Sequence, residues 1–364
     1  MKFTAAREAL LKPLQAVIGV VERRQTMPIL SNVLVIARDG QLSITATDLE
    51  VELVAHADVE TESGGEITVS GRKLLDICRA LPEGSDINIS VSGEKLTVRA
   101  GRSRFNLATL PAAEFPLVED IKAGQSLSVS QETLGRLIEK THFSMAQQDV
   151  RYYLNGMLLE TGGNHLRAVA TDGHRLALCQ AELEGSVDEQ QVIVPRKGVL
   201  ELQRLMSGEG AVNIELGPNH ARIQLEGIRF TSKLIDGRFP EYDRVIPKES
   251  SNELTADREA FKGALQRTAI LSNEKYRGIR LIIRDSGVVM QAHNPEQEEA
   301  EEELEVEYSG EDIEIGFNVN YLLDALGAVD GDTVTLSVLD GNSSCLIRQP
   351  GNDDSKFVVM PMRL

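Results

Sequence analysis

A stretch of twelve residues that recurs three times constrains this chain more than any other feature. The copies read FTAAREALLKPL, LSVSQETLGRLI and LTADREAFKGAL, and they begin at Phe3, Leu127 and Leu254. Each copy opens with a short extended run and continues with apolar residues four apart, which is typical of an amphipathic helix. Ser130 and Asp257 suit the N-cap of the second and third helices. Such self-similarity predicts a repeat architecture.

The similarity continues beyond each helix. Apolar, strand-like runs lie at 33–37, 156–160 and 279–284, and a second set lies at 42–48, 166–172 and 288–294. A second helix then carries matching apolar pairs at 74–76, 199–201 and 322–324. Each repeat therefore has two similar halves, each with a strand, a helix and further strands. The sequence predicts an α+β fold of three domains at 1–118, 126–247 and 252–364, with linkers at 117–125 and 248–252.

Composition fits an ordinary globular protein. The 364 residues divide into three repeats of about 120 residues, a common domain size. No run approaches the ~20 apolar residues of a membrane span, and the N-terminus lacks the features of a signal peptide. Cys78, Cys179 and Cys345 are widely spaced, so buried reduced thiols are favoured over a metal site or disulfides. We therefore expect a cytoplasmic protein without a metal or other cofactor.

The formal net charge of −18 argues against a protein that coats nucleic acid nonspecifically. Local charge still matters, because basic residues concentrate on the predicted helices. The first five helices or their flanks carry Arg23, Arg24, Lys73, Arg79, Arg136, Lys140, Arg196, Lys197, Arg204, Arg258, Lys262 and Arg267. Taken one at a time, these residues are better interpreted as lying on solvated outer faces of the helices.

The acidic run at 296–307 is the most unusual charge feature. A solvated loop is the usual explanation, but Leu304, Val306 and Tyr308 alternate with Glu as in a half-buried strand. Arg102 and Arg104, expected on one face of a strand, form a basic counterpart in the first repeat. Opposite charges in the first and third repeats favour head-to-tail association of two chains.

Few residues indicate catalysis. The sequence lacks the GxGxxG, P-loop, GxSxG and HExxH motifs. Asp172 and His174 are close enough for acid–base chemistry, but Asp-Gly between two strand-like runs is also typical of a hairpin turn. The turn is favoured. Asp353 and Asp354 similarly indicate a turn rather than a metal site.

Long phrases carry a resemblance to a known family. They are QDVRYYLNGM (148–157), ATDGHRLA (170–177), VPRKG (194–198), FTSKL (230–234), AILSNEKYRG (269–278), NPEQEEAEE (294–302), IGFNVNYLLD (315–324) and VVMPMRL (358–364). On these residues the whole chain resembles the bacterial DNA polymerase III β subunits, the replicative sliding clamps. The resemblance implies three DNA-clamp domains per chain and a head-to-tail homodimer around duplex DNA, with helices lining a ring and sheets outside.

The resemblance also implies partners and a location. The partners are double-stranded DNA without sequence preference, DNA polymerase III and other polymerases, the clamp loader, and mismatch-repair and other proteins with a clamp-binding motif. The protein would be cytoplasmic, associated with the nucleoid during replication, and not an enzyme. Residues implied to contact DNA or add positive potential are Arg24, Arg72, Lys73, Arg79, Gln148, Tyr152, Tyr153, Arg196 and Lys197.

A peptide-binding pocket between the second and third repeats is implied as well. Its residues would be Leu154, Thr171, Gly173, His174, Arg175, Leu176, Pro240, Arg244, Val245, Val358, Met360, Pro361, Met362 and Arg363, with Arg151, Tyr153, Asn318, Tyr321 and Ser344 at the margins. Asn342 departs from the pattern, which has an apolar residue there, so that side of the pocket is expected to be more polar.

The implied dimer interface joins the basic and acidic segments. It comprises Arg102, Arg104 and Phe105 from one chain against Ile270, Leu271, Glu296, Glu298, Glu299, Glu301 and Glu302 from the other. Two rival functions remain at this point. One is an enzyme that uses Asp172 and His174, and the other is a scaffold that binds peptides but never DNA.

Overall fold

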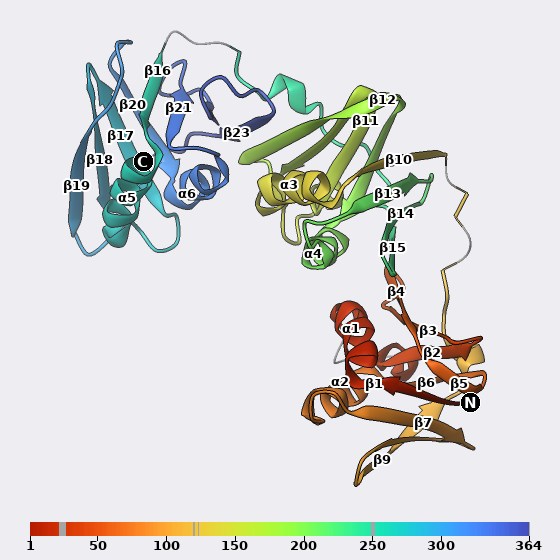
Figure 1. Ribbon diagram of the computed structural model, residues 1–364. Helices are drawn as coiled ribbons and strands as arrows, with labels where there is room; N and C mark the ends of the chain where they lie inside the picture. The colour runs from red at the N-terminus through yellow and green to blue at the C-terminus, as the bar shows by residue number, and fades with distance from the viewer. Residues whose placement is uncertain (22–26, 119–120, 123, 249–251, 364) are drawn as a thin grey trace. The chain divides into compact units, whose positions relative to one another are not determined.

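The computed structural model describes residues 1–21, 27–118, 121–122, 124–248 and 252–363. They form two compact units (Figure 1). The first unit comprises 1–132 with 197–234, and the second comprises 133–196 with 235–364. The division cuts through the second repeat because its strands pair with strands of both neighbouring repeats.

The first unit is built on one long antiparallel sheet. In spatial order its strands are β10 (Gln125–Ser130), β13 (Ala211–Leu216), β14 (His220–Leu225), β15 (Ile228–Lys233), β4 (Val51–Asp58), β3 (Gln41–Thr47), β2 (Asn32–Arg38), β6 (Gly65–Ser70), β9 (Ser103–Leu110), β8 (Lys95–Ala100), β7 (Asp86–Ser92), β1 (Lys2–Ala6) and β5 (Glu60–Ser63).

The second unit has two antiparallel sheets. The larger runs β11 (Gly156–Thr171), β12 (Arg175–Pro195), β23 (Ser355–Val359), β22 (Cys345–Arg348), β21 (Thr333–Ser337) and β16 (Glu253–Asp257). The smaller runs β19 (Glu299–Glu305), β18 (Gly287–His293), β17 (Gly278–Arg284) and β20 (Ile313–Asn318).

Six α-helices occur in the part of the chain that the structure describes. They are α1 (Arg7–Val17), α2 (Gly71–Ala80), α3 (Gln131–Thr141), α4 (Arg196–Leu205), α5 (Arg258–Thr268) and α6 (Val319–Ala328). Two helices in each repeat, each after a strand, confirm the predicted pattern. Asp257 caps α5 as expected, because its Oδ1 accepts a hydrogen bond from the backbone N–H of Ala260 at 2.7 Å. Helix α1 begins without a side-chain cap.

Strand pairing joins each repeat to the next in the same way. Strand β15 of the second repeat pairs with β4 of the first, with Phe230 opposite Leu53. Strand β23 of the third repeat pairs with β12 of the second, with Phe357 opposite Ala177. Both contacts join the last strand of one repeat to the strand that ends the first half of the preceding repeat. The sheets therefore continue across repeat boundaries.

The acidic run forms an ordered strand, as predicted. Strand β19 lies at the edge of the smaller sheet and pairs with β18. Leu304 is half-buried, whereas Val306 and Tyr308 are buried. The expectation that Arg102 and Arg104 share a strand face was wrong, since Arg102 lies in the turn before β9. Among the helices described, none is both long and apolar enough to cross a membrane.

The three cysteines are buried and unpaired with one another, as expected. Burial raises the pKa of the Cys78 thiol to about 11 and that of Cys345 to about 12, and it also raises the pKa of Cys179. Burial therefore disfavours the reactive thiolate at all three positions, and it outweighs the hydrogen bond that Ser355 Oγ donates to the Cys179 sulfur at 3.3 Å.

We expect the native protein to resist thiol reagents. At pH 8 a colorimetric disulfide reagent should titrate almost no thiol in the folded chain and all three after denaturation, because burial both covers the sulfur atoms and keeps them protonated. The measurement is the reaction time course with and without denaturant. Rapid reaction of one folded-state thiol would show that its cover opens readily.

Candidate functional site

The phrase Thr171-Asp172-Gly173-His174-Arg175 forms the hairpin turn between β11 and β12. Asp172 Oδ1 accepts hydrogen bonds from the backbone N–H groups of His174 and Arg175, at 2.8 and 3.1 Å. Gly173 has a φ of 88°, in the region that favours glycine. The turn interpretation is therefore confirmed. The Asp172 carboxylate is committed to the turn and to an ion pair with Arg175 at 3.2 Å, which leaves it poorly suited to proton transfer.

Arg175 connects this turn to helix α6. Its Nη1 lies 2.6 Å from Asp324 Oδ2, and its Nη2 donates to the backbone oxygen of Phe143 at 2.7 Å. The guanidinium also lies over the Tyr321 ring, 4.4 Å from the ring centre. These contacts hold the side chain in one orientation. Arg175 and Tyr321 therefore form a fixed edge beside the turn.

An apolar cavity of about 160 Å³ opens next to the turn. Its wall residues that the structure describes are Arg151, Tyr153, Leu154, Thr171, Gly173, Arg175, Leu176, Pro240, Tyr242, Val245, Val358 and Met360. The backbone N–H of Met360 donates to the His174 oxygen at 2.9 Å, which ties the end of the chain to the turn. Segments far apart in the sequence thus converge on a surface suited to an apolar side chain.

The wall includes Tyr242, which sequence reasoning missed. Its hydroxyl donates to Glu160 Oε1 at 2.8 Å and accepts from Arg167 Nη1 at 2.7 Å. Burial raises the pKa of Tyr242 well above its usual range. The ring is thereby held rigidly. Its place between Pro240 and Val245, both predicted members, was the available signal.

The rim of the cavity is polar on the Arg151 side. Arg151 forms an ion pair with Asp149 at 2.9 Å, and this hydrogen-bonded guanidinium lowers the pKa of the Asp149 carboxyl to about 2. A Cβ at position 173 would lie 2.9 Å from Arg151 Nη2. Glycine there therefore serves both the turn and the close approach of the arginine.

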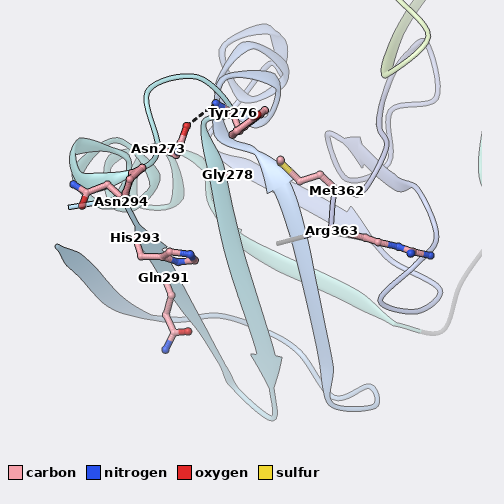
Figure 2. Close-up of a pocket in the computed structure, with 9 residues that line it drawn as sticks. Asn273, Tyr276, Gly278, Gln291, His293, Asn294, Met362 and Arg363 are labelled. Carbon is pink, nitrogen blue, oxygen red and sulfur yellow. Dashed lines mark hydrogen bonds between the residues drawn. The ribbon is translucent and has the colours of Figure 1, made fainter. Parts of the chain in front are cut away.

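The last residues of the chain leave this cavity. The backbone N–H of Met362 donates to the Gly316 oxygen at 2.8 Å, along the edge of β20. Pro361, Met362 and Arg363 line a separate cavity of about 650 Å³ together with Asn342. Met362 and Arg363 also border a third cavity of about 410 Å³, lined by Asn273, Tyr276, Gly278, Gln291, His293, Asn294 and Pro295 (Figure 2).

Several predicted pocket residues lie outside the described wall of the apolar cavity. They are His174, Arg244, Asn318, Tyr321 and Ser344, besides the three C-terminal residues. Asn318 is the N-cap of α6, and its Oδ1 accepts from the backbone N–H of Asn320 at 2.9 Å. Asn342 lines the 650 Å³ cavity and is not among the described wall residues of the apolar one.

The residues predicted to contact nucleic acid differ in how exposed their side chains are to solvent. Arg24 lies outside the described residues. Lys73 and Arg79 are exposed on α2, Gln148 is exposed with a φ of 57°, Tyr152 is 58% exposed and Tyr153 is half-buried.

Three predicted cations instead make contacts within the protein. Lys197 forms an ion pair with Asp48, and Arg72 Nη2 donates to the Val21 oxygen at 2.8 Å. Arg196 Nη1 donates to the Met145 oxygen at 3.5 Å, and burial lowers the pKa of this guanidinium.

The predicted subunit interface lies on strands β9 and β19, on the segments just before them, and on the short 3-10 helix Ala269–Leu271 that follows α5. Arg102 and Arg104 are exposed and Phe105 is half-buried. Leu271 is half-buried, and Ile270, just beyond α5, is 74% exposed, unusual for such an apolar side chain. Glu296, Glu298, Glu299 and Glu301 are exposed. Glu302 is half-buried and forms an ion pair with Arg267.

Three family models match the chain in succession. They describe the N-terminal domain of the DNA polymerase III beta subunit (residues 1–119), its central domain (128–241) and its C-terminal domain (243–363). The chain is 58% identical to a beta sliding clamp of Pseudomonas putida and 52% identical to one of Escherichia coli, with 100% of each sequence covered. A Pseudomonas aeruginosa DnaN sliding clamp solved bound to griselimycin is 57% identical, with a TM-score of 0.97 and 100% of both chains covered.

Proposed function

The chain belongs to the DNA polymerase III beta subunit family and is therefore a sliding clamp, a processivity factor and not an enzyme; from that premise we propose how its own residues do this work. Two copies associate head to tail around duplex DNA. The apolar cavity beside the turn at Thr171–Arg175 captures short peptide segments of polymerases and other partners. The three repeats at 1–118, 126–247 and 252–364 are the domains of the ring.

The cavity is the observation that carries the peptide-binding proposal. Its floor is apolar and buried, with Leu154, Leu176 and Val358 each at most 2% exposed. Arg151 and Arg175 stand at the edge, each held by a carboxylate. A peptide with leucine or phenylalanine side chains would bury apolar area there while its backbone meets polar groups at the rim.

The remaining predicted pocket residues extend this site along the chain end. Met360 lines the apolar cavity, and the next two residues, Pro361 and Met362, line the 650 Å³ cavity. A longer peptide could therefore continue from the apolar cavity along the C-terminal segment. His174, Arg244, Asn318, Tyr321, Ser344 and Arg363 are the proposed outer contacts. Methionine suits such a surface because its flexible side chain adapts to different ligands.

DNA contacts in this proposal rest on the exposed residues. Lys73 supplies charge for phosphate oxygens, while Gln148 and Tyr152 offer polar groups without sequence selectivity. Tyr153, Arg24, Arg72, Arg196 and Lys197 are secondary candidates. The net charge of −18 agrees with retention by encirclement rather than by tight binding. The many acidic groups on the protein surface repel the phosphates of DNA, so favourable contacts are confined to the few exposed basic and polar residues.

The head-to-tail dimer follows the pairing already seen between repeats. In the first junction Arg229 and Phe230 of β15 lie opposite Val54 and Leu53 of β4. Arg104 and Phe105 of β9 occupy the positions of Arg229 and Phe230 in the repeat, and β19 occupies that of β4. The same register would set Arg104 of one chain opposite Glu301 of the next, a favourable charge pair.

The proposed partners follow from this hub. DNA polymerase III and other polymerases, the clamp loader, and mismatch-repair proteins would each present a peptide to the same cavity and therefore compete for it. Nucleoid association during replication would follow from loading onto DNA.

Retention on DNA should depend on topology. We expect the chain, loaded by its clamp loader and ATP, to stay on nicked circular plasmid during gel filtration and to be lost after one restriction cut, because an open end lets a ring slide off. The matched control is the same plasmid cut after removal of the protein. Equal retention on circular and linear DNA would instead indicate ordinary binding, and no retention on either would favour the peptide-only scaffold.

A further inference from the structure

A basic side chain from the second repeat binds the C-terminal end of helix α1. Arg204 of α4 donates from Nη1 to the Gln15 oxygen at 3.0 Å and from Nη2 to the Ala16 oxygen at 2.5 Å. Glu201 orients the guanidinium by accepting from Nε at 3.0 Å. Carbonyl groups in the last turn of a helix lack partners within the helix and carry partial negative charge, so a cation stabilises them.

The junction between the second and third repeats has a contact of the same kind. Lys140 of α3 donates from Nζ to the Ala328 oxygen, at the last residue of α6, and pairs with Asp330, both at 2.5 Å. Its side chain is only 9% exposed. At each junction within the chain, therefore, a cation of one repeat binds the C-terminal end of a helix in its neighbour.

The repeat supplies the same groups at the two ends of the chain. Arg79 and Asp76 of α2 occupy the positions of Arg204 and Glu201 in α4. The carbonyls of Gln266 and Arg267 at the end of α5 occupy those of Gln15 and Ala16 in α1. Arg79 is exposed, and its guanidinium has no hydrogen-bond or ion-pair partner among the residues that the structure describes.

We propose that Arg79 binds the carbonyl oxygens of Gln266 and Arg267 in a second copy of this chain and so fastens helix to helix across the subunit interface. This inference rests on the head-to-tail dimer proposed above. It turns Arg79 from an expected DNA contact into a positioning residue of the ring.

The charges around α5 fit this contact. The Arg267 side chain forms an ion pair with Glu302, so its charge is neutralised, and its backbone carbonyl, which accepts from the Ala269 N–H, has a second lone pair for a partner's cation. An alternative contact across the interface would use the Arg267 side chain, which is equivalent to Lys140 in the repeat, to bind the end of α2 in the partner. That contact would lack an acidic residue equivalent to Asp330. The residue at the Asp330 position in the first repeat is Pro82, which cannot pair with a cation.

The shapes around the helix end also fit. In the first junction the Glu201 carboxylate lies so close to Gly19 that a Cβ there would be 2.2 Å from Glu201 Oε2. The third repeat has Ile270 at the Gly19 position, and the first repeat has the shorter Asp76 at the Glu201 position. Asp76 is one methylene shorter than Glu201, so its carboxylate would stand farther from the Ile270 position, and the partner would cover the Ile270 side chain, which is 74% exposed in the single chain.

The test compares dimer dissociation constants without DNA, by sedimentation velocity on diluted full-length protein. Arg79→Ala should raise the constant about tenfold, since the charged hydrogen bonds across the interface are lost. Arg79→Lys should weaken the dimer less, because lysine keeps the positive charge but cannot donate to both carbonyl oxygens with the planar geometry of a guanidinium. Arg204→Ala is the matched control: it removes the same contact within one chain and should lower the thermal midpoint while leaving the dimer constant unchanged.

Proximity is tested separately by cross-linking. The double variant Arg79→Cys with Gln266→Cys should give covalent dimers with a short bis-maleimide, whereas Arg79→Cys alone should not, because the native cysteines are buried. A monomeric unsubstituted chain at micromolar concentration would overturn the proposed dimer itself. A dimeric chain whose constant is unchanged by Arg79→Ala, with lower retention on loaded DNA, would overturn only the role of Arg79 and return it to the phosphate contacts.

Discussion

The paired reversal Arg102→Glu and Arg104→Glu is expected to convert the dimer into monomers. In the proposed register, Arg104 would face Glu301 on β19 of the partner, where Glu299 and the preceding Glu298 are also exposed. Two new carboxylates would then meet an acidic strand, which replaces attraction by repulsion along the interface. We expect the dissociation constant to rise on the order of 100-fold or more, measured by sedimentation velocity at physiological salt.

A charge swap provides the control. Adding Glu301→Arg to Arg104→Glu should restore much of the dimer, because each interface would again hold opposite charges. The unsubstituted dimer should also weaken as salt rises, since exposed ion pairs are screened. If the double-reversal variant remained a dimer with an unchanged dissociation constant, this pair of strands would be ruled out as the interface. Glu302 is a poorer choice for the swap because it already pairs with Arg267 in its own chain.

Loss of the apolar cavity should abolish peptide binding. We expect a fluorescent Gln-Leu-x-Leu-Phe peptide to bind the intact chain saturably and to lose that binding when Met360 to Leu364 are removed. Val245→Asp should have a similar effect while keeping the chain end, because Val245 is half-buried in the cavity wall and a carboxylate there would need solvation. The measurement is fluorescence anisotropy, with a loss of affinity on the order of 100-fold.

Two methionines make a matched comparison for the same site. Met360 lines the apolar cavity, whereas Met362 lines the two cavities beyond it. Met360→Ala should weaken binding of the short peptide about tenfold, and Met362→Ala should leave it nearly unchanged. A larger effect of Met362→Ala would move the site to the C-terminal cavities. No binding to a folded, dimeric intact chain would contradict the peptide proposal altogether.

Local patterns in the sequence predicted the elements of the fold well. Helix spacing at Phe3–Leu14 and its two copies, the Asp-Gly turn after Thr171, and the alternation around Leu304 each reflect contacts between near neighbours in the chain. These features depend on backbone geometry and on which face is apolar. The structure confirms all of them.

Local sequence patterns could not predict which basic side chains on the helices are exposed to solvent and which are paired within the protein. Lys197, like Lys73, follows an arginine in the first turn of a helix, yet it pairs with Asp48, whereas Lys73 is exposed. Whether a cation on a helix faces solvent or a carboxylate depends on a residue far away in the chain. Spacing along one helix carries no information about that partner.

The sequence by itself determined the threefold α+β repeat, the order of strands and helices, and the Asp-Gly turn after Thr171. The first two follow from periodicity that is repeated in every copy, and the turn follows from the local chemistry of Asp-Gly between two strands. Only the tertiary structure decided that Tyr242 belongs to the cavity wall, that Pro361 to Arg363 leave it, and that Arg204 binds the end of α1. The physical reason is that cavities and helix-end contacts are made by side chains from distant segments, whose meeting depends on how the sheets continue across repeat boundaries.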